Sequence, residues 1–178
     1  MDNGRISVRY ARALFQTAQA LGCEDAVYEG LSRFAHNYLL AIAQFNEALA
    51  DPIVSKEEKV KLMEIAVGEP LHDCLKQFIA FVSEQNRENK MFLIAMKYME
   101  MYRTKHNILS TQVTTASELP EATLDKIKAF VKQTFSAEAE MEVTIDPDLI
   151  GGFILDIENT RMDASVAGQL NALKQKLK

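Results

Sequence analysis

The chain has 178 residues, of which 48% are hydrophobic and 25% are charged, and its formal net charge is −5. These values are typical of a soluble globular protein with one or two domains, and the acidic balance argues against a protein that binds the phosphate backbone of nucleic acids. The longest apolar runs, Leu39–Ala43 and Met91–Met96, are far shorter than the roughly 18–20 residues that cross a bilayer. We therefore expect a protein on the cytosolic side, with no direct membrane insertion.

The first 50 residues show apolar side chains at helical spacing. One stripe runs through Ser7–Leu21, and Gly22 stands where a helix commonly ends. Asp25–Leu49 continues the pattern and predicts either one long helix or a broken pair of helices. Asp51 precedes a proline and is therefore pushed out of helical backbone, so the pattern should stop there.

Helical patterns continue up to residue 106. Ser55 is a candidate N-cap of a short helix, and Gly68 is suited to close it. Leu71–Val82 has the spacing of a core helix, Asn86–Asn89 is a polar break, and Met91–His106 resumes the helical pattern. The sequence to this point predicts five or six antiparallel helices packed as a bundle.

Two of these helices carry a second, partly apolar stripe beside the stripe that faces the core. Such a surface can receive an amphipathic partner helix in a groove, although the same periodicity also fits residues that are simply part of the core. The candidate residues on the first and fifth helices are Tyr10, Ala13, Leu14, Thr17, Phe78, Phe81 and Val82.

The pattern changes after Asn107. Leu109–Ala116 is rich in β-branched residues and predicts a strand, and Pro120 opens a further helix. Glu140–Asp146 alternates polar and apolar residues, as a half-buried strand does. We expect a small α+β domain from residue 107 to residue 178, preceded by a helical domain from residue 1 to residue 106.

A turn, a strand and a capped helix end this domain. Pro147 removes a backbone donor and Gly151–Gly152 permit positive φ, so the chain should turn before a second strand at Phe153–Glu158. Ser165 is placed to cap a terminal helix. Its apolar stripe has helical spacing. Val166, Leu170 and Leu173 are expected in the core of the small domain together with Phe153 and Leu155. The stripe consists of Val166, Leu170, Leu173 and Leu177.

The polar residues give little support for catalysis or for a bound metal. Gly151–Gly152 precedes a strand rather than a helix, so it does not fit a nucleotide-binding loop. Asp146 and Asp148 are better explained by turn chemistry than by metal binding. Cys23 and Cys74 have no second thiol or histidine at ligand spacing, and we expect two reduced, partly buried thiols. We therefore expect no enzyme, no metal site and no cofactor, but a protein that binds partners on each domain.

Three segments resemble one protein family. They are RYARALF (9–15), LADPIVSKEEK (49–59) and DPDLIGGFILDIENTRMDASVAGQLNALKQKL (146–177). Together they are similar to the δ subunit of F-type ATP synthases, whose mitochondrial counterpart is the oligomycin-sensitivity-conferring protein. The resemblance runs essentially from end to end. One departure is Pro120, where many relatives have a Ser or Thr cap, and it affects the helix entry only.

The resemblance implies a fold and a function. The fold is mainly α, with an N-terminal six-helix bundle and a small α+β C-terminal domain. The function is that of a peripheral-stalk (stator) subunit, which is not catalytic and which stops the catalytic head from turning with the central shaft during proton-driven ATP synthesis. The bundle would bind the N-terminal helix of an α subunit, and the C-terminal domain would bind the C-terminal ends of the b subunits. The expected location is the cytoplasmic side of the cell membrane, as a peripheral protein.

Tyr10 and Ala13 match the family's Tyr-Ala-x-Ala segment, and the resemblance implies that they belong to the α-subunit site. The other five candidate residues rest on periodicity alone. Two different readings stay open on the sequence. One is a generic helical protein-interaction adaptor unrelated to ATP synthase, and the other is an RNA-binding α+β module, which the acidic charge opposes.

Overall fold

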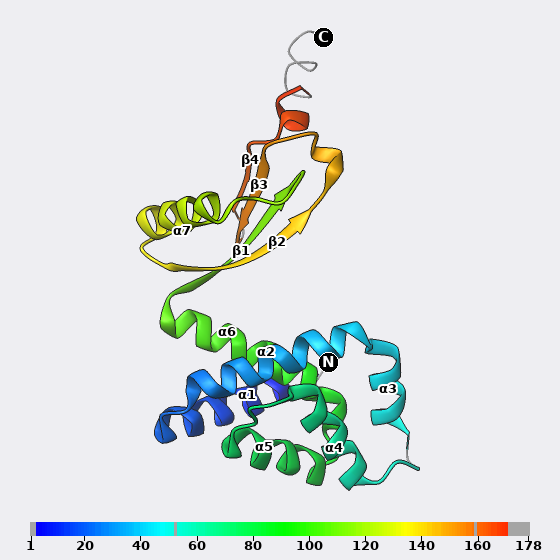
Figure 1. Cartoon of the computed structure of the whole chain (residues 1–178). Helices are drawn as coiled ribbons and strands as arrows, with labels where there is room; N and C mark the ends of the chain where they lie inside the picture. Colours follow the sequence, from blue (N-terminus) through cyan, green and yellow to red (C-terminus); the bar gives the residue numbers. More distant parts are fainter. Residues whose placement is uncertain (1–2, 52, 159, 171–178) are drawn as a thin grey trace. The chain divides into compact units, whose positions relative to one another are not determined.

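The first part of the chain is a bundle of α-helices (Figure 1). The computed structural model describes residues 3–51, 53–158 and 160–170. Within these ranges six α-helices precede the first strand, which agrees with the expected six-helix bundle. They are α1 (Asn3–Leu21), α2 (Glu24–Leu40), α3 (Ile42–Ala50), α4 (Lys56–Val67), α5 (Asp73–Glu84) and α6 (Met91–His106).

The segment predicted as one long helix or a broken pair is a broken pair. Ala41 leaves helical backbone at φ −132° and ψ 37°, and its amide still donates to the carbonyl of Tyr38 at 3.3 Å. The Tyr38 hydroxyl reaches over the break to the Asn46 side chain at 2.5 Å. Phe34, Tyr38 and Phe45 remain buried on both sides of the break, so the two helices share one apolar stripe.

Helix boundaries follow from local side-chain chemistry. Ser55 caps α4: its hydroxyl accepts from the Glu58 amide, and the Glu58 carboxylate accepts from the Ser55 amide at 2.9 Å. This reciprocal pair satisfies two of the free amides at the start of a helix. The predicted polar break before α6 contains a short 3-10 helix, η1 (Glu88–Lys90), and the Ser83 hydroxyl donates to the buried Glu88 carboxylate at 3.1 Å.

A layer of fully buried side chains fills the bundle. Tyr98 is the largest of them, and its hydroxyl donates to the backbone carbonyl of Glu24 at 3.1 Å. Phe15 packs edge-on against the Tyr98 ring at 5.4 Å between centroids. The buried hydroxyl is therefore hydrogen-bonded, and this bond connects α6 to the start of α2.

In its described residues, the second part of the chain is a four-stranded sheet with one long helix on it. Its elements are β1 (Ile108–Thr115), α7 (Glu121–Phe135), β2 (Glu138–Ile145), the 3-10 helix η2 (Pro147–Leu149), β3 (Phe153–Ile157) and β4 (Thr160–Asp163). The strand order is β2-β1-β3-β4. β1 and β2 are parallel and joined through α7, as a parallel pair requires, whereas the β1–β3 and β3–β4 pairs are antiparallel.

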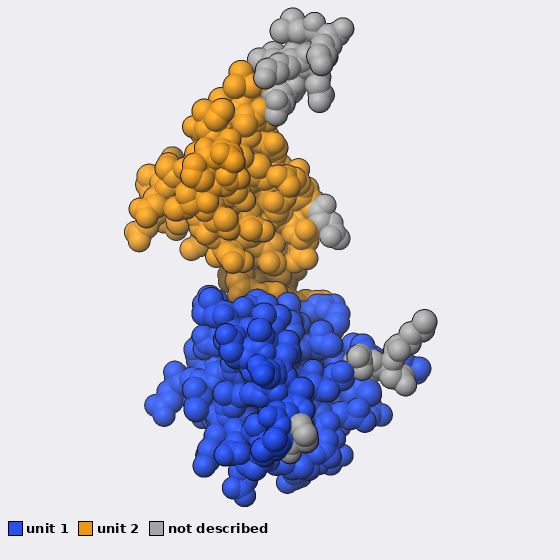
Figure 2. Space-filling model, turned by 90° about the vertical axis from the view of Figure 1, so that its right-hand side faces the viewer, with its two compact units in different colours: residues 1–102 blue, residues 103–178 orange. Residues whose placement is uncertain are grey.

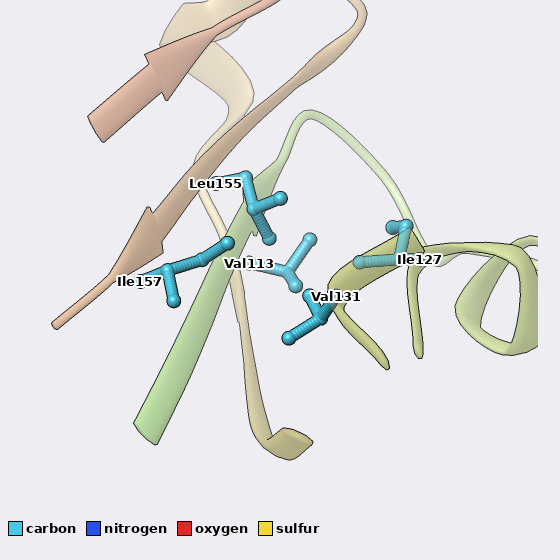
Figure 3. Close-up of a cluster of buried hydrophobic side chains, with 5 residues drawn as sticks. All are labelled: Val113, Ile127, Val131, Leu155 and Ile157. Atoms are coloured by element: carbon cyan, nitrogen blue, oxygen red, sulfur yellow. The ribbon is translucent and has the colours of Figure 1, made fainter. Parts of the chain in front are cut away.

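The sheet and α7 enclose a small apolar core (Figure 3). Val113, Leu155 and Ile157 point from the sheet toward Ile127 and Val131 of α7. These strand residues share one face because side chains alternate along a strand. The fold class expected from the sequence, mainly α with a small α+β domain at the C-terminal end, is confirmed.

Two expectations about this second part are corrected. The expected core includes Val166 and Leu170, but these side chains are 40% and 47% exposed and do not belong to the cluster of buried residues between the sheet and α7. Leu173 and Leu177 lie outside the described residues. Strand β4 was not expected, because all four of its residues are exposed and its sequence lacks an apolar alternation.

The chain divides into two compact units, Met1–Tyr102 and Arg103–Lys178 (Figure 2). Each unit has its own buried core, one built on Tyr98 and its neighbours and the other on Val113 and Leu155. No described helix is long and apolar enough to span a membrane.

A candidate partner-binding surface on the helical bundle

Helix α1 has an inward face and a flank with different degrees of burial. Ala11, Leu14 and Ala18 are at most 2% exposed and face the core. Tyr10 lies on the neighbouring flank and is half-buried, and Ala13 and Thr17 on the same flank are exposed. The Thr17 hydroxyl donates to the Ala13 carbonyl at 2.9 Å, so its polar group is turned back to its own helix. The flank therefore presents mainly small and apolar atoms to the outside.

Helix α5 is arranged in the same way. Leu75, Ile79 and Val82 are fully buried, whereas Phe78 is half-buried and Phe81 is 47% exposed. Phe78 and Phe81 are three residues apart, so they share one face of the helix. An aromatic side chain of this size exposed to nearly half of its surface is a feature that calls for a partner.

The two flanks meet. The rings of Tyr10 and Phe81 lie 5.9 Å apart between centroids, with an angle of 31° between their planes. We call the surface formed by Tyr10, Ala13, Thr17, Phe78 and Phe81 the α1–α5 surface. The structure thus brings five of the seven predicted residues to an accessible position on the two helices.

Leu14 and Val82 occupy a different position from the other five. Leu14 is 2% exposed and Val82 is fully buried. They support the α1–α5 surface from the core side and offer almost no surface of their own to a partner. The stripe pattern could not separate them, because each lies only one helical step from a residue on the flank.

Helix α1 also carries a charge pattern that its apolar stripes do not show. The helix contains Arg5, Arg9 and Arg12 but no acidic residue, in a chain whose net charge is −5. The Arg9 guanidinium lies 6.0 Å from the centre of the Tyr10 ring, at the edge of cation–π distance. The signal in the sequence is three arginines at positions 5, 9 and 12 without a carboxylate, and Arg9 beside Tyr10 gives the α1–α5 surface a positive border.

The two cysteines lie together in the bundle and are free, as expected. Cys23 precedes α2 and Cys74 lies in the first turn of α5, and both are 7% exposed. Burial, together with the neighbouring Cys23, raises the pKa of the Cys74 thiol to about 11. Because the thiolate is the reactive form, this thiol is unreactive at neutral pH.

The aspartates of the C-terminal unit serve its turns. Asp146 accepts from the Asp148 amide at 3.0 Å and caps η2, as turn chemistry predicts. Asp163 accepts from both the amide and the hydroxyl of Ser165, which lowers the pKa of its carboxyl. The Ser165 hydroxyl in turn accepts from the Gly168 amide at 2.9 Å, so the predicted cap of the terminal helix is confirmed.

The protein is of a two-unit class: a helical bundle is followed by a small mixed sheet covered by a helix. The bundle carries a partly exposed aromatic pair on its surface. The family model described as "ATP synthase delta (OSCP) subunit" matches residues 6–177. The chain therefore belongs to the ATP synthase delta (OSCP) subunit family, which confirms the resemblance of its three sequence segments.

Individual relatives agree with this assignment. An ATP synthase subunit delta of Phocaeicola vulgatus is 38% identical over 173 residues, covering 97% of this chain and 93% of the relative. An ATP synthase subunit delta of Bacteroides fragilis is 34% identical over 178 residues, covering 98% and 95%. Among solved structures, a chain of the mitochondrial ATP synthase hexamer of Toxoplasma gondii matches with a TM-score of 0.61 at 20% identity, covering 96% of each chain. The last match supports the fold.

Proposed function

We propose that this chain is a non-catalytic peripheral-stalk subunit that links the catalytic head of an F-type ATP synthase to the b subunits. In this proposal the N-terminal unit binds the N-terminal helix of an α subunit, and the C-terminal unit binds the C-terminal ends of b. The link keeps the head from turning with the central shaft during proton-driven synthesis. The protein then works at the cytoplasmic side of the cell membrane, held there by its partners.

The observation that carries the proposal is the half-exposed aromatic pair of the α1–α5 surface. Tyr10 and Phe81 lie 5.9 Å apart on adjacent helices, with small residues beside them on α1. Small side chains next to large aromatic ones form a shape into which the apolar face of a helix can pack. Rigid aromatic anchors of this kind commonly carry most of the binding energy of an interface.

A link that survives turnover has to bind tightly. Roughly nanomolar affinity, about −12 kcal/mol, is the order required. A standard-sized helix-in-groove contact reaches this value when its central anchors are well packed, although its area alone does not guarantee it. The three arginines of α1 favour a partner helix with acidic residues, and added salt should therefore slow its association.

The test uses two matched charge substitutions on α1. Ala13→Asp places a carboxylate on the α1–α5 surface, and Gln19→Asp places one on the opposite flank of the same helix, where Gln19 is exposed. We expect Ala13→Asp, and likewise Tyr10→Asp, to weaken the binding of an α-subunit N-terminal peptide by at least 100-fold, about 2.7 kcal/mol. Gln19→Asp should bind like the unmodified chain in the same titration calorimetry.

Circular dichroism should show equal helix content in all three variants, because Ala13 and Gln19 are exposed and Tyr10 lies on the flank of α1 and not on its inward face. If Ala13→Asp and Tyr10→Asp bind the peptide as tightly as the unmodified chain, the α1–α5 surface is not the α-subunit site. A pull-down with purified catalytic head separates the stalk function from that of an unrelated helical adaptor, which would not retain the head.

A further inference from the structure

Strand β2 is an outer strand of the sheet in the C-terminal unit (Figure 1). It stands last in the order β2-β1-β3-β4 and pairs with β1 along its whole length, Glu138–Ile145. The Asp146 amide, just after the strand, donates to the Thr115 carbonyl of β1 at 2.7 Å. Because backbone amides point alternately to the two sides of a strand, the amides of Val143 and Ile145 point away from β1. They are donors that a further strand could use.

The outer side of β2 has little of the protection that edge strands usually carry. Proteins shield such edges with prolines, lysines, bulges or very short strands. β2 has eight residues, contains neither proline nor lysine, and pairs one-to-one with β1 without a bulge, whereas β4 at the other edge has only four residues. The charged residues of β2 are all glutamates, which oppose an acidic neighbouring strand but not a basic one. β2 is therefore the edge that can accept a further strand.

The two faces of β2 differ in character. Val143 pairs with Val113, whose side chain points toward α7, so Val143 and Ile145 lie on the α7 face of the sheet. Helix α7 leaves both partly uncovered, since they are 41% and 50% exposed. Glu140 and Glu142 alternate with these residues and lie on the opposite face. An added strand would meet apolar side chains on one face and carboxylates on the other.

The carboxylate of Glu142 is the acidic group of β2 most open to a basic partner. The Arg103 Nε atom lies 2.6 Å from the Glu140 carboxylate, and the Lys132 ammonium group lies 3.4 Å from that of Glu138. Glu142 is exposed and takes part in none of the ion pairs formed among the described residues. It stands beside the exposed end of the strand, where a cation would complete the pairing.

We propose that β2 binds an extended segment of another protein, in which apolar residues alternate with lysine or arginine, as an added strand. The backbone of this segment would pair with the outward groups of Val143 and its neighbours. Its apolar side chains would lie beside Val143 and Ile145, and a basic side chain would lie beside Glu142. In strand addition of this kind, the backbone hydrogen bonds give affinity and the alternate side chains give specificity.

The charge of β2 selects against a second copy of this chain as the added strand. Two β2 strands paired antiparallel about a two-fold axis would place the glutamates of both copies on one face. Like charges on neighbouring strands destabilise the pair, whereas a basic segment gains from the same carboxylates. The net charge of −5 adds a general attraction for a basic segment.

The first test varies the peptide and uses the full chain. The labelled peptide KVKVKVK alternates as the proposed partner does, and KKVVVKK has the same composition without the alternation. Fluorescence anisotropy at low salt measures both dissociation constants. We expect KVKVKVK to bind about tenfold more tightly, because the scrambled peptide cannot place its valines on one face and its lysines on the other. Equal affinities, or no binding of KVKVKVK, would overturn the proposal.

The second test varies the chain. Val143→Pro removes one outward amide and leaves the bonds to β1 in place, and Val143→Ala is its control because both variants lose the valine side chain. We expect Val143→Pro to bind KVKVKVK about tenfold more weakly than Val143→Ala. Equal binding by these two variants would show that the outer side of β2 is not the site.

A matched pair of charge reversals tests the polar face. Glu142→Lys should weaken the binding of KVKVKVK about fivefold, through a like charge beside the peptide's lysine. Glu57→Lys changes the net charge equally at an exposed position of the first unit and should bind like the unmodified chain. Equal weakening in the two variants would reduce the effect to general charge attraction and overturn the proposal.

Thermal melts followed by circular dichroism show whether each variant folds. If Val143→Pro does not fold, the peptide comparison and the charge reversals decide without it. A dimer in analytical ultracentrifugation that Glu142→Lys strengthens and Glu57→Lys does not would overturn the proposal in favour of a second copy. The proposal does not depend on the stalk function, because the chain is measured without any α-subunit peptide. A negative result here therefore leaves the α1–α5 surface untouched, and a failure at that surface leaves this test valid.

Discussion

Gly152 shows how one residue can fix the geometry of a turn. Its φ is 77°, a left-handed value that favours glycine. A Cβ at this position would lie 2.3 Å from the Ala164 carbonyl oxygen and 3.0 Å from the Ser165 Cα. Both are backbone atoms that cannot move aside cheaply, so the start of β3 and the chain after β4 can approach closely only at a glycine.

We therefore predict that Gly152→Ala lowers the free energy of unfolding of the C-terminal unit by about 3 kcal/mol, through backbone strain and steric overlap. Gly151→Ala is the matched control, because a Cβ there would meet only the Val166 side chain at 3.3 Å, which can shift. Urea denaturation of both variants checks the prediction. Similar losses in the two variants would mean that the close approach at Gly152 is not what limits stability.

The Ser55 cap makes a prediction about pH. Hydrogen bonds from the hydroxyl and amide of Ser55 lower the pKa of the Glu58 carboxyl below its ordinary value of 4.5. A lowered pKa in the folded state stabilises the fold above the unfolded value, and this stability is lost as the pH falls through the folded value. Ser55→Ala should therefore destabilise the bundle more at pH 7 than in acid.

In that variant the pKa of Glu58 should return toward its ordinary value, which an NMR titration of the side-chain carboxyl would measure directly. Glu57→Gln is the control, since Glu57 is exposed in the same turn without a part in the capping pair. A loss of stability in Ser55→Ala that is the same at every pH would show that the hydroxyl acts through packing or helix propensity and not through Glu58.

At the scale of elements, α6 is held in the bundle by a buried tyrosine. Tyr98 is fully buried, and its hydroxyl donates to the Glu24 carbonyl at the start of α2. Burial, with lesser effects from nearby groups such as Cys23, raises the pKa of this hydroxyl, so it stays protonated and able to donate. Removing the hydroxyl leaves the part-buried Glu24 carbonyl without this donor.

Tyr98→Phe should cost about 1 kcal/mol of unfolding free energy while keeping the ring packing with Phe15. Tyr10→Phe is a useful comparison, because Tyr10 is half-buried on the α1–α5 surface and not in the core of the bundle. Thermal denaturation should place the Tyr98→Phe midpoint below that of Tyr10→Phe. Equal midpoints would mean that the hydrogen bond between Tyr98 and Glu24 contributes nothing net.

Much of the element order was predictable, because it depends on local signals. The Ser55 cap, the proline before α7 and the alternation along β2 and β3 each act within a few residues, and each was found from the sequence. The break at Ala41 was only one of two alternatives, since the apolar stripe of α2 continues through α3 without a change of spacing. Strand β4 has no apolar alternation because all of its residues are exposed, so its sequence does not predict a strand.

The candidate site was predictable only in part, for a related reason. Periodicity gives the angle of a side chain around its own helix but not the position of the neighbouring helix. It therefore grouped the buried Leu14 and Val82 with the accessible Ala13 and Phe81. The pairing of Tyr10 with Phe81 needed the packing of α1 against α5, which no local pattern contains.

At the scale of the whole molecule, the division into two units has a mechanical meaning under the proposed function. Each unit has a core of its own, so each can hold one partner with its own stable surface. A stator needs both attachments at once, because torque passes through them in series. The loss of either attachment should then uncouple proton flow from ATP synthesis to a similar extent, even though the remaining attachment is intact.

This predicts that two single substitutions each disrupt one attachment and leave the other intact. Ala13→Asp should abolish retention of the catalytic head while leaving retention of the b C-terminal segment unchanged, since its charge lies on the α1–α5 surface. Gly152→Ala should weaken retention of b and leave the head bound, because its strain is confined to the second unit. Pull-downs with each purified partner measure the two attachments separately, and ATP-driven proton pumping in reconstituted membranes should fall in both variants. If either variant loses both partners, the two units do not act as separate binding modules, and torque must pass through one shared surface instead.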